Sequence, residues 1–97
     1  MNKSDLIQRL ADQCQLSQKD ARGVVEALFA TDPRQGIIAT ALENGEKVQI
    51  TGFGTFEIRD RKARTGRNPR TGETLQIAAS RVPAFSAGKA FKDRYSL

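Results

Sequence analysis

The sequence predicts an α+β fold, in which helices come first, a three-stranded antiparallel sheet with a protruding two-stranded arm follows, and a short helix ends the chain. As far as Gly45, apolar residues recur every three or four positions, and beyond it they alternate with polar residues. Turns that contain glycine or proline divide the second part into segments of strand length. Ninety-seven residues fit at most one domain. We therefore expect a single domain over 1–97, with a helical region over 1–45, a sheet region over 46–85 and a C-terminal helical region over 86–97.

Capping signals mark the first two helices. Asn2 precedes Asp5 by three residues and Ser17 precedes Asp20 in the same way, an arrangement that caps a helix N-terminus. We expect helices over 2–14 and about 18–30, each with one apolar face. These faces contain Ile7, Leu10, Ala11 and Cys14 in the first helix, and Ala21, Val24, Val25, Leu28 and Phe29 in the second.

A third helix is expected to begin at Pro33, because proline is favourable at the first helical position behind a Thr or Asp cap. Gly45 is expected to adopt a left-handed conformation just past its C-terminal end. The apolar face of this third helix comprises Ile37, Ile38, Ala41 and Leu42.

Three strands follow. Val48 and Ile50 alternate with polar residues in the first, and the turn 51–54 leads into a second strand from Thr55 to about Arg64. Residues 65–72 are turn-rich, and a third strand is expected from Leu75 to about Val82, where Pro83 ends it. Ser86 is expected to cap a last helix over 87–96, with Ala90, Phe91 and Tyr95 facing inward.

The hairpin around residues 65–72 lacks apolar support. Between Arg59 and Leu75 there is no apolar side chain larger than Ala63. An isolated two-stranded ribbon is only marginally stable in water. We therefore expect an arm over about 59–76 that projects from the sheet and is mobile until it binds a partner.

The charge of the chain is concentrated near this arm. Residues 1–58 contain six Lys/Arg and eight Asp/Glu, whereas residues 59–97 contain ten Lys/Arg and three Asp/Glu. Such a basic segment indicates a polyanionic partner, nucleic acid first and an anionic membrane second. Arginine predominates in the arm, and its planar guanidinium suits phosphate and a narrow minor groove.

Pro69 lies in the middle of this basic segment. A proline side chain is stiff and its nitrogen carries no hydrogen, so it is suited to insertion between base pairs. The alternative is an ordinary turn, since Asn68-Pro69 and Thr71-Gly72 are common turn dipeptides.

Other functions find little support in the composition. The chain has no histidine and only Cys14, which lies on an apolar helix face, so we expect no enzyme, no cofactor, no metal and no small-molecule substrate. The arm has no aromatic residue for base stacking, which argues against RNA or single strands. There is no signal peptide and no apolar stretch of transmembrane length, so we expect a cytoplasmic protein without a membrane partner.

The segment GFGTFEIRDRKARTGRNPRTGE (52–73) resembles the signature of the bacterial histone-like family of HU and integration host factor. The segments MNKSDLI at the start, GEKVQITGFGTF at 45–56 and VPAFSAGKAFKD at 82–93 are also similar to that family. The resemblance implies a nucleoid-associated, intertwined dimer, with 1–45 as its helical dimerisation region, that bends double-stranded DNA through the minor groove with low sequence specificity. A sequence-selective subunit like integration host factor is the alternative, as is a heterodimer in place of a homodimer.

The resemblance also implies particular contacts. Pro69 would be the intercalating wedge, Lys3 is a weaker DNA-binding candidate, and Phe53, Phe56 and Phe85 match positions that pack the dimer core. The expected DNA-binding residues are Arg59, Arg61, Arg64, Arg67, Asn68, Pro69, Arg70, Arg81, Lys89 and Lys92.

Two departures from the family pattern stand out. The region FATDPRQGIIATALENG is about six residues longer than usual, so the second helix should be broken and the dimer geometry altered. Ala78 occupies a position where relatives commonly have proline, which is expected to change the flexibility of the arm.

Overall fold

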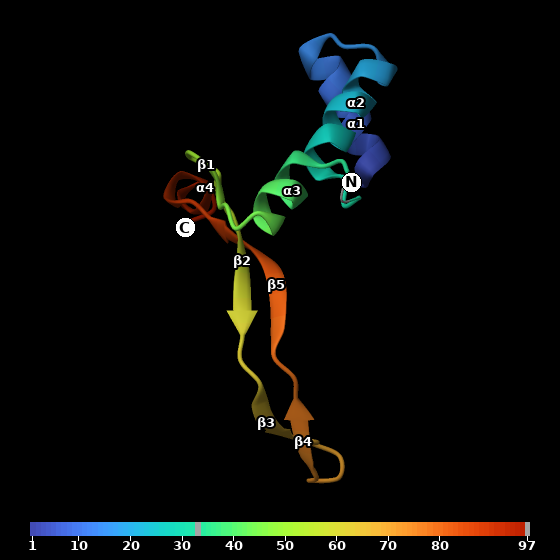
Figure 1. Cartoon of the computed structure of the whole chain (residues 1–97). Helices are drawn as coiled ribbons and strands as arrows, with labels where there is room; N and C mark the ends of the chain where they lie inside the picture. Colours follow the sequence, from blue (N-terminus) through green and yellow to red (C-terminus); the bar gives the residue numbers. More distant parts are fainter. Residues whose placement is uncertain (33, 97) are drawn as a thin grey trace. The chain divides into compact units, whose positions relative to one another are not determined.

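The computed structural model describes residues 1–32 and 34–96. It divides into two compact units, one from Met1 to Asn44 and one from Gly45 onward, which we describe separately. The α+β class is confirmed, while the expectation of one domain over the whole chain stays a prediction. The elements are α1 (Lys3–Cys14), α2 (Gln18–Phe29), α3 (Ile37–Glu43), β1 (Val48–Ile50), β2 (Gly54–Arg61), β3 (Arg64–Arg67), β4 (Thr74–Ile77), β5 (Ser80–Ala87) and α4 (Lys89–Asp93) (Figure 1).

The first two helices begin as their capping signals predict. The Asn2 side chain accepts a hydrogen bond from the backbone N–H of Asp5 at 2.9 Å, and the Asp5 carboxylate accepts one from the backbone N–H of Asn2 at 3.0 Å. Ser17 Oγ accepts from the backbone N–H of Asp20 at 3.0 Å. These bonds satisfy amide groups that have no partner within a helix.

The third helix begins four residues later than predicted. Gly36 is its N-cap and Ile37 its first residue, so the expected start at Pro33 is wrong, although Pro33 itself lies outside the described residues. The backbone N–H groups of Arg34 and Gln35 donate to the side chain and the carbonyl of Asp32, at 2.8 and 2.9 Å. Gly36 follows this turn with a φ of 88°, which is outside the helical region and separates the turn from α3. The predicted left-handed Gly45 is confirmed, with φ of 82°.

The core of the first unit is small. It consists of Ile7, Ala11, Ala21 and Val25, with Leu10 packed against it. Leu42 is buried as well. The remaining apolar positions predicted on the faces of α1 and α2 are exposed, namely Cys14, Val24, Leu28 and Phe29.

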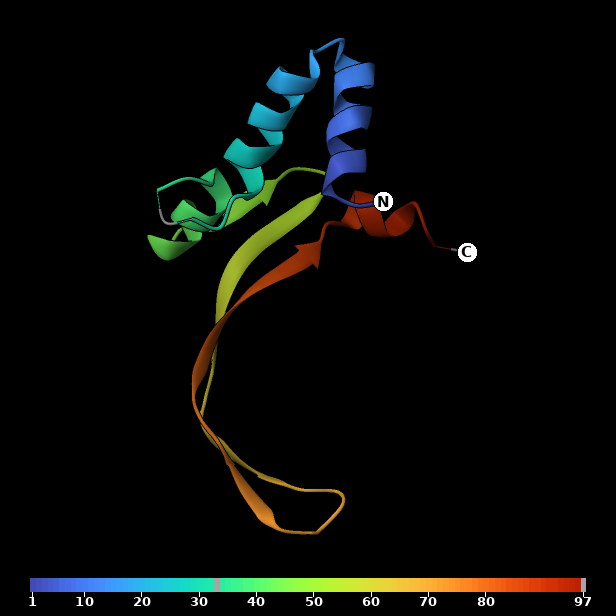
Figure 2. The same cartoon turned by 90° about the vertical axis from the view of Figure 1, so that its right-hand side faces the viewer.

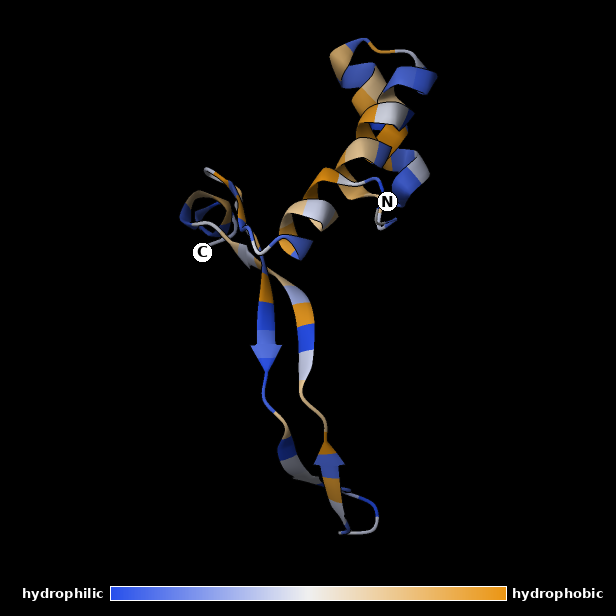
Figure 3. Ribbon diagram, viewed as in Figure 1, coloured by the Kyte–Doolittle hydropathy of each residue, from blue (hydrophilic) through white to orange (hydrophobic). Residues whose placement is uncertain are grey.

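The sheet of the second unit has the strand order β1-β2-β5, and both pairs are antiparallel. The prediction that Pro83 ends the last strand is wrong, because Pro83 lies inside β5, opposite Ile58. Because β5 is an edge strand, a proline whose missing N–H faces outward leaves the ladder with β2 intact. In Figure 3, β2 is hydrophobic near β1 and hydrophilic toward the arm, because its apolar residues Phe56 and Ile58 are followed by Arg59, Asp60 and Arg61.

The arm is a separate ribbon of β3 and β4. The second predicted strand is interrupted at residues 62–63, and residues 78–79 interrupt the other side of the hairpin. Arg64–Arg67, partly assigned to the turn in the prediction, therefore form a strand of their own. The ribbon extends away from β1 and α4 and curves along its length (Figures 1 and 2).

The last helix is shorter than predicted and has a different cap. Gly88 is the N-cap of α4, whereas Ser86 lies in β5 opposite Thr55. Tyr95 lies beyond the helix and is 66% exposed, so its predicted inward orientation is wrong. Ala90 is also exposed, and Phe91 is half-buried.

Aromatic rings pack at the end of the sheet next to α4. The ring centroids of Phe53 and Phe91 are 4.7 Å apart, and Phe85 lies 5.5 Å from Phe53 and 4.8 Å from Phe56. Within the described ranges, no helix has the length and apolar character needed to cross a membrane.

Candidate nucleic-acid interface

A hydrogen-bonded turn presents Pro69 at the tip of the arm. The backbone N–H of Asn68 donates to the carbonyl of Glu73 at 2.8 Å, and the N–H of Gly72 donates to the carbonyl of Asn68 at 2.7 Å. The Asn68 side chain accepts from the N–H of Arg70 at 2.9 Å, across Pro69. Gly72 has a φ of 74°, which favours glycine. Pro69 is therefore exposed on a constrained loop.

The two faces of the ribbon carry different side chains. Residues paired across an antiparallel ladder share a face, and Arg64 pairs with Ile77 while Gly66 pairs with Leu75. Arg64 therefore lies on the apolar face of the ribbon. Arg67 pairs with Thr74 and lies on the polar face, together with Thr65 and Gln76. The predicted arm arginines thus do not all share one side.

Nearer the sheet, β2 presents basic residues on one face. By alternation along the strand, Thr55, Glu57, Arg59 and Arg61 share this face, with Ser86 opposite Thr55. We call this the Arg59 face. The opposite face, which carries Phe56, Ile58 and Asp60, we call the Phe56 face. The structure thus brings Arg59 and Arg61 together, as predicted.

A carboxylate lies between the cations of the Arg59 face. Glu57 Oε1 is 3.1 Å from Arg59 Nε, and Glu57 Oε2 is 3.4 Å from Lys47 Nζ. The hydrogen bonds from Arg59 and, next, from Lys47 lower the pKa of Glu57. Lys47 was not among the predicted site residues, because only the pairing of β1 with β2 places it beside Glu57.

Arg81 is separated from the other predicted arginines. It pairs with Asp60 across the ladder, so it lies on the Phe56 face, and its Nε is 3.1 Å from Asp60 Oδ1. Both side chains are well exposed. The expectation that Arg81 binds DNA stays a prediction, and the register places its side chain on the face opposite Arg59.

The lysines outside the sheet are partly engaged. In α4, Lys89 Nζ is 2.9 Å from Asp93 Oδ2, whereas Lys92 is exposed. Lys3 is in the first unit, with its Nζ 2.6 Å from Glu26 Oε1. These pairs are exposed, so a phosphate can compete for either lysine at little energetic cost.

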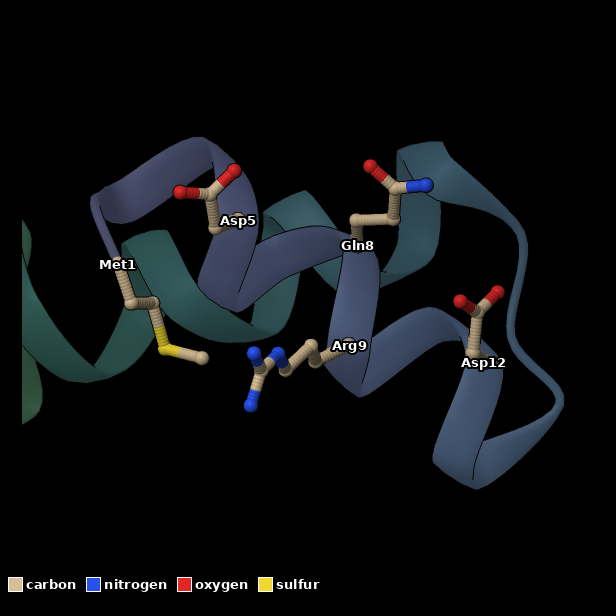
Figure 4. A pocket seen from close by; sticks show the side chains of 5 residues that line it. All are labelled: Met1, Asp5, Gln8, Arg9 and Asp12. Carbon is tan, nitrogen blue, oxygen red and sulfur yellow. The ribbon is translucent and has the colours of Figure 1, made fainter.

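Other kinds of site find no basis in the described part of the chain. It contains no group of three or more His, Cys, Asp or Glu residues placed to hold a metal ion. Cys14, which the sequence places on the apolar face of the first helix, is exposed. A shallow hollow on α1 is lined by Met1, Asp5, Gln8, Arg9 and Asp12, and these side chains are spread along the helix without converging on one point (Figure 4).

Comparisons with known proteins agree with a nucleic-acid interface. The family model described as "Bacterial DNA-binding protein" matches residues 1–96. The chain is 55% identical over 92 residues to the DNA-binding protein HU of Streptococcus thermophilus, covering 95% of this chain and 94% of that protein. It is 53% identical over 93 residues to the DNA-binding protein HU 1 of Bacillus subtilis, covering 96% and 95%.

Solved structures of HU proteins also match this chain. The chain matches an HU–DNA cocrystal structure from Anabaena with a TM-score of 0.77 and 44% identity, over 97% of this chain and 96% of that one. It matches HU from Thermotoga maritima with a TM-score of 0.62 and 32% identity, over 99% and 100%. The similarity extends over the arm as well as the helices, because nearly all of each chain is covered.

Proposed function

This chain belongs to the bacterial DNA-binding protein family, and from this premise we propose that it is an architectural protein that binds and bends double-stranded DNA. Its relatives named DNA-binding protein HU favour an HU-like role, with low sequence specificity, over that of a sequence-selective subunit like integration host factor. A protein of this function works on bacterial DNA, so the proposal places it with the nucleoid in the cytoplasm.

The observation that carries this proposal is the arginine-rich ribbon with an exposed proline at its tip. A two-stranded ribbon fits into a groove of DNA, and arginine side chains beside it neutralise phosphates. Arg67 and Arg70 flank the tip, where Asn68 holds the turn that presents Pro69. Insertion of an apolar wedge between base pairs, with bending of the duplex, is the mechanism known for this family.

Low sequence specificity follows from the type of contact. The minor groove distinguishes A·T from G·C pairs but carries little further sequence information. We therefore infer that DNA shape and flexibility, more than base identity, select the binding site. The sheet adds Arg59, Arg61 and Lys47 as further phosphate contacts.

We also propose that the chain acts as a dimer. Only five apolar residues are buried among the described residues of the first unit, which is little for an independently stable fold. Large apolar side chains are exposed in the single chain, including Phe29 at 50%, Ile50 at 49% and Phe53 at 46%. A second copy of the chain is the proposed cover, and light scattering on the purified protein measures the mass directly.

A competition experiment tests the DNA-binding proposal. Fluorescence anisotropy is measured with a labelled mixed-sequence duplex, and unlabelled competitors are a second unrelated duplex and a single strand of equal length. We expect the two duplexes to compete equally and the single strand to compete poorly. If one duplex competed far better, the protein would be a sequence-selective binder, and if the single strand competed best, the proposal would be wrong.

A further inference from the structure

The Arg59 face contains one carboxylate, Glu57, among the cations that are proposed to bind phosphate. Its side chain is only 22% exposed, while the carboxylates of the other ion pairs, on Glu26, Asp60 and Asp93, are 39%, 79% and 57% exposed. Glu57 thus lies within the basic surface, not at its edge. Its position calls for an explanation, because a negative charge here repels the DNA backbone.

The geometry around Glu57 resembles that of a bound phosphate. One carboxylate oxygen contacts the guanidinium of Arg59 and the other contacts the ammonium of Lys47, at 3.1 and 3.4 Å. A phosphate diester also has two terminal oxygens that share one negative charge, and arginine and lysine are the side chains that bind it. Carboxylate and phosphate can therefore occupy the same position between these two cations.

Arg59 is held by a further contact. Its Nη2 donates to Ser86 Oγ at 2.6 Å, across the ladder from β2 to β5. With Nε on Glu57 and Nη2 on Ser86, the guanidinium is fixed over the sheet. In the free protein, Ser86 and Glu57 therefore hold the Arg59 side chain in place, and the Glu57 carboxylate balances its charge.

We propose that Glu57 is an internal competitor of DNA phosphate, which holds Lys47 and Arg59 in the free protein and is displaced from them when DNA binds. The inference rests on the proposed DNA-binding function. Part of the binding reaction then exchanges one anion for another at Lys47 and Arg59, so that fewer counterions are released from the DNA into solution in total. Glu57 thereby limits both the affinity for DNA and its dependence on salt.

The test compares Glu57→Gln with Asp60→Asn. Each variant replaces a carboxylate by an amide of the same shape and raises the net charge by one. Asp60 lies three residues away on the Phe56 face, where it pairs with Arg81, so it is a matched control for net charge. Affinity for a mixed-sequence duplex of about 35 base pairs is measured over a series of salt concentrations.

We expect Glu57→Gln to bind DNA more tightly than wild type and with a steeper salt dependence. Each additional phosphate that is neutralised changes the slope of log K against log salt by about −0.9. For one such phosphate, the gain in affinity at 50 mM salt should exceed the gain at 200 mM about 3.5-fold. Asp60→Asn should leave the slope unchanged.

A second comparison uses Lys47→Gln in both backgrounds. In wild type, the lost cation is already balanced by Glu57, so the loss of affinity should be small. In Glu57→Gln, Lys47 is free for phosphate, so its loss should cost more affinity, and this loss should be about 3.5-fold larger at 50 mM than at 200 mM salt. Such non-additivity is the measure of coupling between two residues in contact.

Three results overturn the inference while leaving the proposed function intact: an unchanged slope in Glu57→Gln, weaker binding by that variant, or equal effects of Glu57→Gln and Asp60→Asn. Weaker binding by Glu57→Gln would mean that the carboxylate positions Arg59 for DNA instead of competing with the DNA phosphate. If wild type showed no salt-sensitive binding to the duplex at all, the proposed function itself would fail. A thermal melt of each variant confirms that the fold is retained.

Discussion

Replacing Arg67 and Arg70 by alanine should flatten the salt dependence of DNA binding. Both residues are exposed, one at the end of β3 and one in the tip turn. None of the five ion pairs formed between described residues involves either of them. Their guanidinium groups therefore have no competing carboxylate to leave when they meet a phosphate.

The size of the effect follows from counterion release. If each arginine neutralises one phosphate, the double variant Arg67→Ala/Arg70→Ala should have a slope of log K against log salt that is less negative by about 1.8. Over a fourfold change in salt, the wild-type affinity then falls about 12-fold more than that of the variant. An interface with six to ten phosphate contacts loses roughly 10³–10⁵ in affinity over the same range, so a change of this size is measurable.

Anisotropy titrations with a mixed-sequence duplex between about 50 and 200 mM salt give the two slopes. The double variant Arg81→Ala/Lys89→Ala removes the same charge, but its residues pair with Asp60 and Asp93, and Arg81 lies on the Phe56 face. We expect it to change the slope less. Equal slopes for the two double variants would show that net charge, and not the arm tip, governs binding.

Three further predictions concern the wedge, the sheet and pH. Pro69→Ala should retain most of the DNA affinity but lower the rate at which ligase closes short duplexes into circles, and an unchanged rate would rule out the wedge. Gly54→Ala should destabilise the protein by about 1–3 kcal/mol, since a Cβ there would lie 2.5 Å from the Phe85 ring and from the Ser86 carbonyl oxygen. The control Gly23→Ala, on a helix and with nothing within 4 Å, should raise the melting temperature, and the account of Gly54 fails if both variants melt alike. DNA affinity should be constant between about pH 5 and 8, because there is no histidine and the lowered pKa of Glu57 keeps that carboxylate ionised there. A change of affinity near neutral pH, in buffers of equal ionic strength, would show that a group other than Glu57 titrates there. The contribution of Glu57 to folding stability is present above its unfolded-state pKa and is lost as pH falls through the lower folded-state pKa.

Local signals in the sequence were sufficient for the starts of α1 and α2 and for the arm. The hydrogen bonds of Asn2, Asp5 and Ser17 depend only on residues three positions away, so spacing alone predicts them. The arm was predictable for a similar reason, since residues 59–74 lack large apolar side chains whatever the rest of the chain does.

Signals that depend on distant residues were misread. Pro83 is compatible with a strand only because β5 is at the edge of the sheet, and strand order is not visible in the sequence. Ser86 was expected to cap a helix, but its hydroxyl accepts a hydrogen bond from Arg59, which is 27 positions away. Tertiary pairing thus outweighed a plausible local signal.

The composition of the candidate site was predicted better than its arrangement. The basic residues could be found by counting charges, but their distribution between two faces depends on the register of β2 with β5, which separates Arg81 from Arg59. Lys47 was missed because it precedes a short strand and reaches Glu57 only through the pairing of β1 with β2. A shift of register by one residue reverses every such assignment.

Bending of the bound duplex is measured by fluorescence resonance energy transfer between the two ends of a duplex of about 35 base pairs, a length over which DNA resists smooth bending. Binding is followed at the same time by the anisotropy of one dye, at low and high salt. We expect energy transfer to rise as the protein saturates the duplex and the rise to be reversed when the salt concentration is raised. Saturable, salt-sensitive binding without any rise in transfer would contradict this expectation, and would leave a protein that coats DNA with Pro69 as a turn residue only.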